Sequence, residues 1–499
     1  MTQLPLVSAL WLTPLAGACV VRAVPVRRRT AAKYTAVGVS IIVLALAGLL
    51  LVSFDRINPG YQLVESHSWI RSFGAGYIVG VDGVAMVLVV LTAVLVPLLL
   101  IAGWNDAERP HGYLALMLAV ESMMLICLVA LDVLLFFVFF EAMLIPMFFL
   151  VGRYGGAGAP RAALKFLLYS LFGGLLMLAA LIRLNLASAG TFDFRAIVAA
   201  VSSGTGSANP VVMHFLFLGF MVAFAIKAPL WPLHTWLPGV AAEATPATAV
   251  LMMAVVDKIG TFGMLHYCLK LFPDSAILFR PFIVALAVIA IIYGALVAIG
   301  QIDILGVIAY ASISHFGFIV LGIFVMTEQS QSGATLYMVN HGLATAALFL
   351  IAGFLVSRKG TRLIAAYGGV QQVAPVLAGT FLIAGLASLA LPGLAPFVSE
   401  FLVLVGTFTR YPVSAVLAAS ALVLLAIYVL WLYQRVMTGP RKQGDAALRD
   451  LRPRELAVVV PLLALLVILG VYPKPALDVI NPAIGRAVTE SVSPASLRG

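Results

Sequence analysis

The chain has 499 residues, of which 63% are hydrophobic and only 10% are charged, and its mean hydropathy is +1.11. This composition excludes a soluble domain and indicates a polytopic membrane protein. The formal net charge of +10 is therefore interpreted as a signal of membrane topology and not of nucleic-acid binding.

Fourteen segments are apolar and long enough to cross a bilayer as helices, at about 20 residues each. A second span follows the first at once, so the first is expected to be a retained anchor and not a cleaved signal. The sequence thus predicts an all-α fold in a lipid bilayer. The predicted spans are 3–22, 31–54, 78–103, 111–131, 133–152, 162–188, 211–231, 246–271, 278–300, 303–326, 333–357, 375–408, 412–438 and 455–473.

Lysine and arginine are distributed unequally between alternate loops. The positive-inside rule places the basic side in the cytoplasm, and an even number of spans then puts both termini outside. The last basic stretch is expected to lie along the cytoplasmic surface, as a plain amphipathic linker helix or as a docking element. Eighteen of the 30 basic residues lie on one side, in 22–33, 109, 153–165, 358–362 and 435–454, against seven in the loops of the other side.

Two spans carry prolines that should break their helices. Pro229 and Pro232 lie in the seventh span, and Pro392 and Pro396 lie in the twelfth. Proline removes a backbone donor and clashes with the preceding turn. The breaks are five spans apart, and an odd offset inverts the orientation in the membrane. Spans four to eight and nine to thirteen therefore fit two inverted five-helix units, with ordinary proline kinks as the alternative.

These breaks suggest a division of the chain into four parts, none of which is a separate soluble domain. Three N-terminal spans come first, and two antiporter-like units follow. A basic cytoplasmic linker and the last span complete the chain. The expected boundaries are 1–110, 111–275, 276–438 and 439–499.

Single ionisable side chains recur inside these apolar spans. A charge at bilayer depth costs at least a few kcal/mol, and such residues usually line ion or proton pathways. Glu121 and His234 are secondary candidates, because Glu121 could pair with a neighbouring subunit and His234 could serve as a cap or an interfacial residue. The main candidates for a proton relay are Glu141, Lys227, Lys258, His315, His341 and Glu400.

Each main candidate also has a structural interpretation. Glu141 and Lys227 form either a proton switch or a static buried salt bridge. Lys258 is the expected relay and Asp257 its lateral partner, because successive helical residues point about 100° apart. The two histidines are relay groups or hydrogen-bonded structural residues. Glu400 accepts a proton from the path or stabilises the helix break.

No motif for a cofactor is visible. Cys19, Cys127 and Cys268 are far apart, and no metal or Fe–S spacing surrounds them. There is no dinucleotide-binding GxGxxG after a strand and no P-loop. The sequence therefore predicts no redox cofactor, metal or nucleotide site in this chain.

Six motifs in order resemble the antiporter-like membrane subunits of respiratory complex I, NADH:quinone oxidoreductase. The resemblance covers roughly residues 75–440 and is closest to the M type (chain 4). The motifs are VGVDGVAMVLVVLT (79–92), FEAMLIPMFFLVGRYGG (140–156), IKAPLWPLHTWLP (226–238), DILGVIAYASISHFGF (303–318), NHGLATAALFL (340–350) and LASLALPGLAPFVSEF (386–401).

The resemblance implies a role for individual residues. Glu141 and Lys227 correspond to the family's switch pair, and Lys258 corresponds to its central relay. The L and N types carry a lysine on the second broken helix, whereas the M type carries a glutamate, here Glu400. The sequence departs from the family at 239–249, where Asp-Ala-His and then Glu-Ala-Pro are typical, and at Asp257, a position that is usually apolar.

The implied function is proton translocation driven by NADH oxidation and quinone reduction in other subunits. NADH, FMN, Fe–S clusters and quinone are then expected in partner subunits, with the L-type and N-type subunits as neighbours. Composition and length suggest a bacterial plasma membrane. The alternative is a subunit of a multisubunit sodium/proton antiporter, against which Glu400 argues. A structural scaffold would not explain the broken helices together with the ionisable residues, and a solute carrier would need polar clusters that are sparse here.

Overall fold

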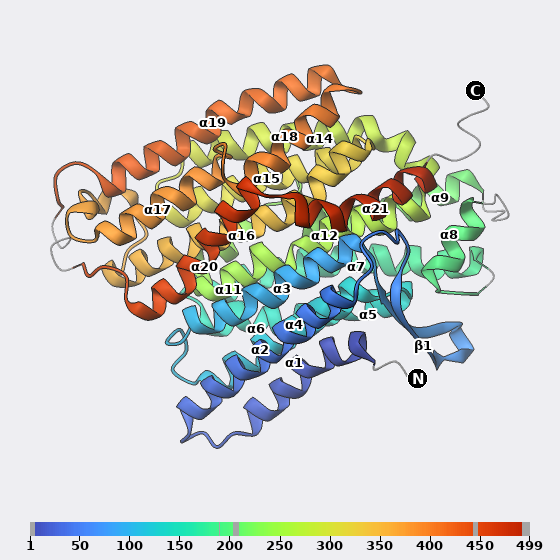
Figure 1. Ribbon diagram of the computed structural model, residues 1–499, viewed down its shortest axis with the longest axis horizontal. Coiled ribbons are helices and arrows are strands. Elements are labelled where there is room, and N and C mark those ends of the chain that lie inside the picture. Colours follow the sequence, from blue (N-terminus) through green and yellow to red (C-terminus); the bar gives the residue numbers. More distant parts are fainter. Residues whose placement is uncertain (1–4, 189, 203–208, 443–447, 492–499) are drawn as a thin grey trace.

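The computed structural model describes residues 5–188, 190–202, 209–442 and 448–491. Figure 1 shows long helices lying side by side, most of them running between the left and right ends of the view. Thirteen helical segments of the described residues are apolar and long enough to cross a bilayer. The prediction of an all-α polytopic membrane fold is confirmed.

The N-terminal part contains a β-hairpin that hydropathy does not predict. The predicted third span begins at 78, but the strand continues to Val81 and Asp82 then caps the helix, accepting a hydrogen bond from the backbone N–H of Ala85 (2.8 Å). Asp82 thus has a structural role at the start of this helix. The elements are α1 (Leu6–Ala23), α2 (Arg29–Ser53), β1 (Gln62–Ile70), the 3₁₀ turn η1 (Arg71–Phe73), β2 (Ala75–Val81), antiparallel to β1, and α3 (Gly83–Ala102).

The next five predicted spans are more interrupted than the sequence suggests. The fifth bends at Met143, which separates α5 from α6. The elements are α4 (Pro110–Val129), α5 (Val133–Ala142), α6 (Leu144–Tyr154), α7 (Ala159–Ala187), α8 (Phe194–Ser202), α9 (Pro210–Lys227), α10 (Leu237–Glu243), α11 (Pro246–Val250), the π-helix η2 (Leu251–Val256), α12 (Lys258–Gly263), the π-helix η3 (Met264–Cys268) and α13 (Leu269–Leu271).

The first predicted break is present between α9 and α10. Helix α9 ends at Lys227, and the prolines Pro229 and Pro232 lie in the irregular segment that follows. Backbone groups freed by such a break need new partners inside a membrane protein. Trp236 donates its indole N–H to the carbonyl of Ile226 (2.9 Å), and Lys165 donates to the carbonyl of Thr235 (2.6 Å).

The C-terminal half contains longer, straighter helices and a second break. The twelfth predicted span, at 375–408, is present as the shorter apolar pair α17 and α18. The elements are α14 (Pro273–Ile299), α15 (Ile304–Phe324), α16 (Glu328–Lys359), the 3₁₀ turns η4 (Ile364–Ala366) and η5 (Val370–Gln372), α17 (Pro375–Ser388), α18 (Ala395–Phe408), α19 (Pro412–Met437), α20 (Pro453–Val471) and α21 (Lys474–Ser491).

Left-handed backbone makes the second break. Ala390 has φ 56° and Gly393 has φ 93°, conformations that a continuing helix does not allow. Pro392 lies inside the break, and Pro396 lies in the first turn of α18, where proline is well tolerated. The Asn340 side chain of α16 donates to the carbonyl of Ala395 (2.7 Å), the first residue of α18, and so ties the end of the break to α16.

The segment 439–454 is not the linker helix that its composition suggests. Residues 443–447 lie outside the described part, and residues 439–442 and 448–452 have no helical turn. Asp450 instead accepts hydrogen bonds from the backbone N–H groups of Val376 (2.9 Å) and Leu377 (2.8 Å) at the start of α17. This segment therefore caps another helix.

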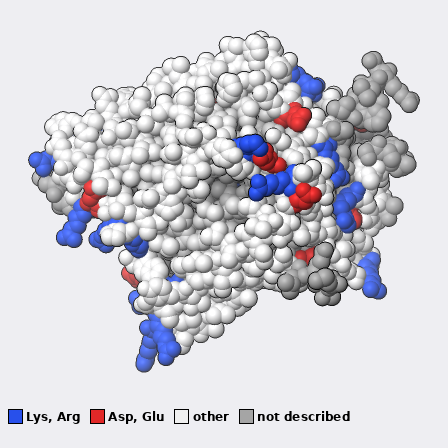
Figure 2. Space-filling model, viewed as in Figure 1, with Lys and Arg blue, Asp and Glu red and all other residues white. Residues whose placement is uncertain are grey.

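Charged side chains mark the two ends of the bundle. Figure 2 shows blue and red atoms at both ends of the long axis and in a mixed patch near α21, while most of this face is white. The basic segments meet at one end, where Arg362 donates to the carbonyl of Ala242 (2.6 Å) and pairs with Glu243 (3.3 Å). A broad uncharged band between charged ends is the surface that a bilayer requires.

Candidate proton-transfer site

Lys258 and His341 form the first part of a buried polar path. The Lys258 ammonium lies 2.7 Å from Nδ1 of His341, and it also donates to the carbonyl of Met253 (3.0 Å). Its third neighbour is the ring of Phe316, whose centroid is 4.4 Å away. Both side chains are buried. A proton on the lysine therefore has a basic ring nitrogen within direct transfer distance.

His315, Tyr337 and Glu400 form the second part. Nδ1 of His315 lies 2.7 Å from the hydroxyl of Tyr337, and this hydroxyl donates to Oε2 of Glu400 (3.1 Å). A phenol has one proton, so donation to Glu400 means that the hydroxyl accepts from His315. The second carboxylate oxygen of Glu400, Oε1, has no hydrogen-bond partner among the described residues.

A gap separates the two parts. The rings of His341 and His315 lie side by side, with centroids 5.4 Å apart, and no hydrogen bond joins them in the described structure. Nε2 of His341 lies near the hydroxyls of Ser312 (3.1 Å) and Thr345 (3.2 Å). Nε2 of His315 lies near the hydroxyl of Ser388 (3.3 Å). Lys258, His341, His315, Tyr337 and Glu400 together are called the central polar path below.

Tyr337 is the functional candidate that sequence analysis missed. It lies four residues before His341 on α16, so both side chains face the same side of that helix. This spacing is a signal that the sequence contains. A tyrosine in an apolar helix is nevertheless common in protein cores, and nothing in the sequence shows that its hydroxyl meets Glu400.

Lys258 lies on a helix with unusual geometry. The short helix α12, on which Lys258 is the first residue, lies between the π-helices η2 and η3. π-helical turns are rare and occur frequently at functional sites. Asp257 immediately precedes Lys258, and its two carboxylate oxygens are buried without a partner among the described residues. Asp257 is within electrostatic range of both Lys258 and Lys227.

Glu141 and Lys227 are neighbours without direct contact. Lys227 is buried, and its ammonium lies over the rings of Phe140 (5.1 Å) and Phe166 (5.4 Å). No hydrogen bond or ion pair joins it to Glu141 in the described part of the chain. The two groups still interact electrostatically. The structure thus holds the pair in a separated arrangement and not as a closed salt bridge.

Gly174 of α7 leaves the space that the Glu141 carboxyl group occupies. A Cβ atom at this position would overlap the Glu141 carboxyl group. Glu141 itself lies two residues before the bend between α5 and α6. The carboxylate is therefore positioned by a glycine on one side and by an interrupted helix on the other.

The two secondary candidates lie outside this path. Glu121 is fully buried inside the chain, and neither of its carboxylate oxygens has a partner among the described residues. Pairing with a neighbouring subunit stays an untested alternative for Glu121. His234 is also buried, with its ring against that of Tyr293 (5.0 Å between centroids). Its Nδ1 has no partner in the described structure, so the side chain does not cap a helix through this nitrogen.

The described residues contain no group of three or more His, Cys, Asp or Glu side chains that could hold a metal ion. All three cysteines are free; Cys19 is exposed, and Cys127 and Cys268 are buried.

Known membrane proteins resemble this chain along most of its length. A family model described as "NADH:quinone oxidoreductase/Mrp antiporter, TM" matches residues 130–427. The chain is 60% identical to "NADH-quinone oxidoreductase subunit M" of Mycobacterium tuberculosis, over 98% of this chain and 95% of the relative.

Two solved structures have the same fold. One is a chain of respiratory complex I from Thermus thermophilus with bound NADH, which has a TM-score of 0.88, 30% sequence identity and coverage of 97% of this chain and 99% of that one. The other is a chain of the Mrp complex from Dietzia, with a TM-score of 0.84 and coverage of 99% and 100%; at 19% identity it shows the fold alone. The family match spans more than half of the chain, and the chain therefore belongs to the family of NADH:quinone oxidoreductase and Mrp antiporter transmembrane subunits.

Proposed function

We propose that the chain is the M-type, proton-translocating membrane subunit of an NADH:quinone oxidoreductase. The observation that carries this proposal is the 60% identity, over almost the whole length, to a relative of that name. The central polar path supplies residues that can move protons through an otherwise apolar bundle. NADH, FMN, Fe–S clusters and quinone belong to partner subunits in this proposal.

The proposed mechanism begins at Glu141 and Lys227. The structure holds the two without direct contact, and a conformational or electrostatic signal that moves them further apart leaves the charge of Lys227 less balanced. Lys227 then repels the proton on Lys258 through the low-dielectric interior, where Coulomb interactions are strong. Asp257, within electrostatic range of both lysines, moderates this repulsion.

The proton then leaves Lys258 along the central polar path. His341 accepts it directly, since the ammonium and Nδ1 are 2.7 Å apart. Ring rotation or an intervening water carries it across to His315, and Tyr337 passes it to Glu400. Moving one charge against 100 mV costs about 2.3 kcal/mol. The redox reaction in the partner subunits supplies this energy.

The membrane orientation belongs to the same proposal. The end of the bundle where segments 22–33, 153–165, 358–362 and 435–454 meet faces the cytoplasm, and both termini face outward. The membrane is a bacterial plasma membrane, and the L-type and N-type subunits are the neighbours. Similarity to the Mrp complex concerns the fold alone, so no observation favours the sodium/proton antiporter over complex I.

The first test is a tagged pull-down from native membranes. NADH:quinone reductase activity in the eluate, together with flavin and Fe–S partners, supports the proposal. A small assembly without cofactors contradicts it and points to the antiporter alternative.

The second test is the variant Lys258→Ala in inverted membrane vesicles. The complex should assemble, and NADH-driven proton uptake, followed by acridine-dye quenching, should fall by about tenfold or more because the relay group is gone. Lys474→Ala is the control; this lysine is exposed in a surface ion pair with Asp478 (2.6 Å) and should have no effect. Unchanged proton uptake in Lys258→Ala would remove Lys258 from the mechanism.

A further inference from the structure

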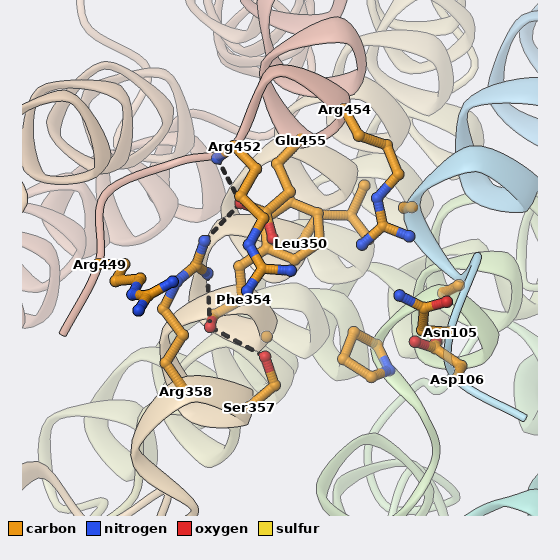
Figure 3. A pocket seen from close by; sticks show the side chains of 14 residues that line it. Asn105, Asp106, Leu350, Phe354, Ser357, Arg358, Arg449, Arg452, Arg454 and Glu455 are labelled. Atoms are coloured by element: carbon orange, nitrogen blue, oxygen red, sulfur yellow. Dashed lines mark hydrogen bonds and ion pairs between the residues drawn. The ribbon is translucent and has the colours of Figure 1, made fainter. Parts of the chain in front are cut away.

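A second polar feature lies at the basic end of the bundle, away from the central polar path. It is a cavity of about 430 Å³ between the end of α3, the start of α11, the last turns of α16 and the segment that leads into α20. Figure 3 shows four arginines around it, together with Asn105 and Asp106. We call it the arginine pocket; its charged lining residues are Arg358, Arg449, Arg452, Arg454, Asp106 and Glu455.

Of the four guanidinium groups, only that of Arg358 has a protein partner among the described residues; Arg449 and Arg452 are exposed. Arg358 donates to the carbonyls of Phe354 (2.8 Å) and Asp450 (3.3 Å) and pairs with Glu455. The guanidinium groups of the other three arginines have no ion pair among the described residues. For Arg454, Nη1 is closed off from solvent and has no hydrogen-bond partner there. A buried donor of this kind costs free energy unless a partner reaches it.

The two carboxylates do not balance these arginines. Glu455 is already occupied, because it binds Arg358 and accepts from the backbone N–H of Arg452 (2.8 Å). Burial raises the pKa of Asp106 to about 6, partly offset by the backbone of Ala247, by Thr245 and by Arg454. Lys33 adds another positive charge at the edge of the pocket, where its ammonium donates a hydrogen bond to Asn105 (3.4 Å).

The arrangement of donors and apolar groups indicates the class of ligand. Three guanidinium groups without an ion pair in the described part of the chain surround one cavity, and they offer more hydrogen-bond donors than the two oxygens of a carboxylate can accept. Phosphate oxygens match the planar forks of several arginines at once. Leu350, Phe354 and Pro246 line the same cavity with apolar groups, so a phosphate that carries organic groups also fits.

We propose that the arginine pocket binds a phosphate group, held mainly by Arg452 and Arg454. Two sources share this chemistry: the headgroup of an anionic phospholipid and free inorganic phosphate. In either case the bound anion joins α3, α16 and the start of α20 at one end of the bundle. The inference does not depend on the proposed proton path.

The test uses the intact native assembly that contains the chain, purified in detergent. We would compare the wild type, the double variant Arg452→Gln/Arg454→Gln and the control Arg161→Gln. Arg161 is exposed, lies at the same basic end and is not a pocket residue. Phospholipid that remains after delipidation is measured by mass spectrometry, and binding of radiolabelled orthophosphate is measured by equilibrium dialysis.

The wild type and the control should retain an anionic phospholipid that the double variant loses, or should bind orthophosphate at least about tenfold more tightly than it does. Loss of lipid alone identifies a headgroup, and loss of orthophosphate binding identifies the free anion. Equal lipid content and equal phosphate binding in all three proteins would overturn the proposal.

A measurement on the wild type covers the case in which the double variant does not assemble. Hydrogen exchange of the backbone in 448–458 is followed with short-chain phosphatidylglycerol, with orthophosphate and with short-chain diacylglycerol, which lacks the phosphate. Protection by either phosphate compound, and none by diacylglycerol, supports the site. No protection by either phosphate compound contradicts it.

Discussion

At the scale of single residues, the hydroxyl of Tyr337 is the atom on which the second half of the central polar path depends. It bridges His315 and Glu400, and no hydrogen bond joins these two side chains directly in the described structure. The ring of tyrosine also fills core volume. The two roles can be separated, because phenylalanine keeps the ring and removes only the hydroxyl.

We therefore predict that Tyr337→Phe assembles but loses NADH-driven proton uptake by about tenfold or more, as expected for removal of a proton-transfer group. The measurement is dye quenching in inverted vesicles, normalised to the amount of complex on a native gel. Tyr472→Phe, at an exposed tyrosine after α20, is the matched control. Normal proton uptake in Tyr337→Phe would show that Glu400 receives its protons by another route.

Gly174 provides a second prediction at this scale. A methyl group there must displace the Glu141 carboxyl group, so Gly174→Ala should weaken the electrostatic coupling between Glu141 and Lys227. Proton uptake per NADH oxidised should fall several-fold while the complex still assembles. Gly379→Ala serves for comparison, because no atom lies within 4 Å of its new Cβ. An unchanged ratio in Gly174→Ala would mean that the position of Glu141 is not critical.

The main candidate residues could be predicted from the sequence, but their connections could not. A lone charge in an apolar span is visible by composition, which is why Lys227, Lys258 and Glu400 stand out. The gap between His341 and His315, and the separation of Glu141 from Lys227, depend on side-chain positions in three dimensions. The sequence predicts Asp257 as a lateral partner of Lys258, whereas in the structure it also interacts electrostatically with Lys227.

At the scale of elements, hydropathy predicts where helices lie but not how their backbones deviate. Both broken helices follow from proline, because proline removes a donor at a known position. The bend at Met143 has the same cause, because Pro146 removes the hydrogen bond to the carbonyl of Ala142, but this proline is not among the breaks predicted from the sequence. The π-helices η2 and η3 carry no such signal. The β-hairpin is also missed, because β1 lies in a stretch that reads as a polar loop and the apolar end of β2 reads as the start of the third span.

The second break permits a direct test of backbone strain. Gly393 has φ 93°, and a Cβ added there would have no atom within 4 Å, so alanine would be disfavoured by conformation alone. We predict that Gly393→Ala destabilises the protein by about 1–2 kcal/mol, the cost of forcing an L-residue to positive φ. The midpoint of thermal dissociation should fall, whereas Gly379→Ala in α17 should leave it equal or higher. Equal midpoints for Gly393→Ala and the wild type would show that the break relaxes freely.

At the scale of the whole molecule, the sidedness of the bundle can be tested by labelling. After Cys19, the exposed native cysteine, is replaced by serine, single cysteines are introduced as Arg28→Cys and Arg71→Cys. Both arginines are exposed, and they lie at opposite ends of the bundle in the proposed topology. An impermeant maleimide should label position 28 only in inverted vesicles and position 71 only in spheroplasts. The reverse pattern would invert the proposed orientation.

The gap in the central polar path has one more consequence for the membrane as a whole. A continuous row of hydrogen-bonded groups would conduct protons in both directions and discharge the gradient that the complex builds. With 5.4 Å between the ring centroids of His341 and His315 and no hydrogen bond between them in the described structure, the path is interrupted in this arrangement. The gap that a proton must cross during turnover therefore prevents proton leakage between turnovers. A mutation that joins His341 to His315 by a hydrogen bond should let protons leak back and so uncouple proton transport from NADH oxidation.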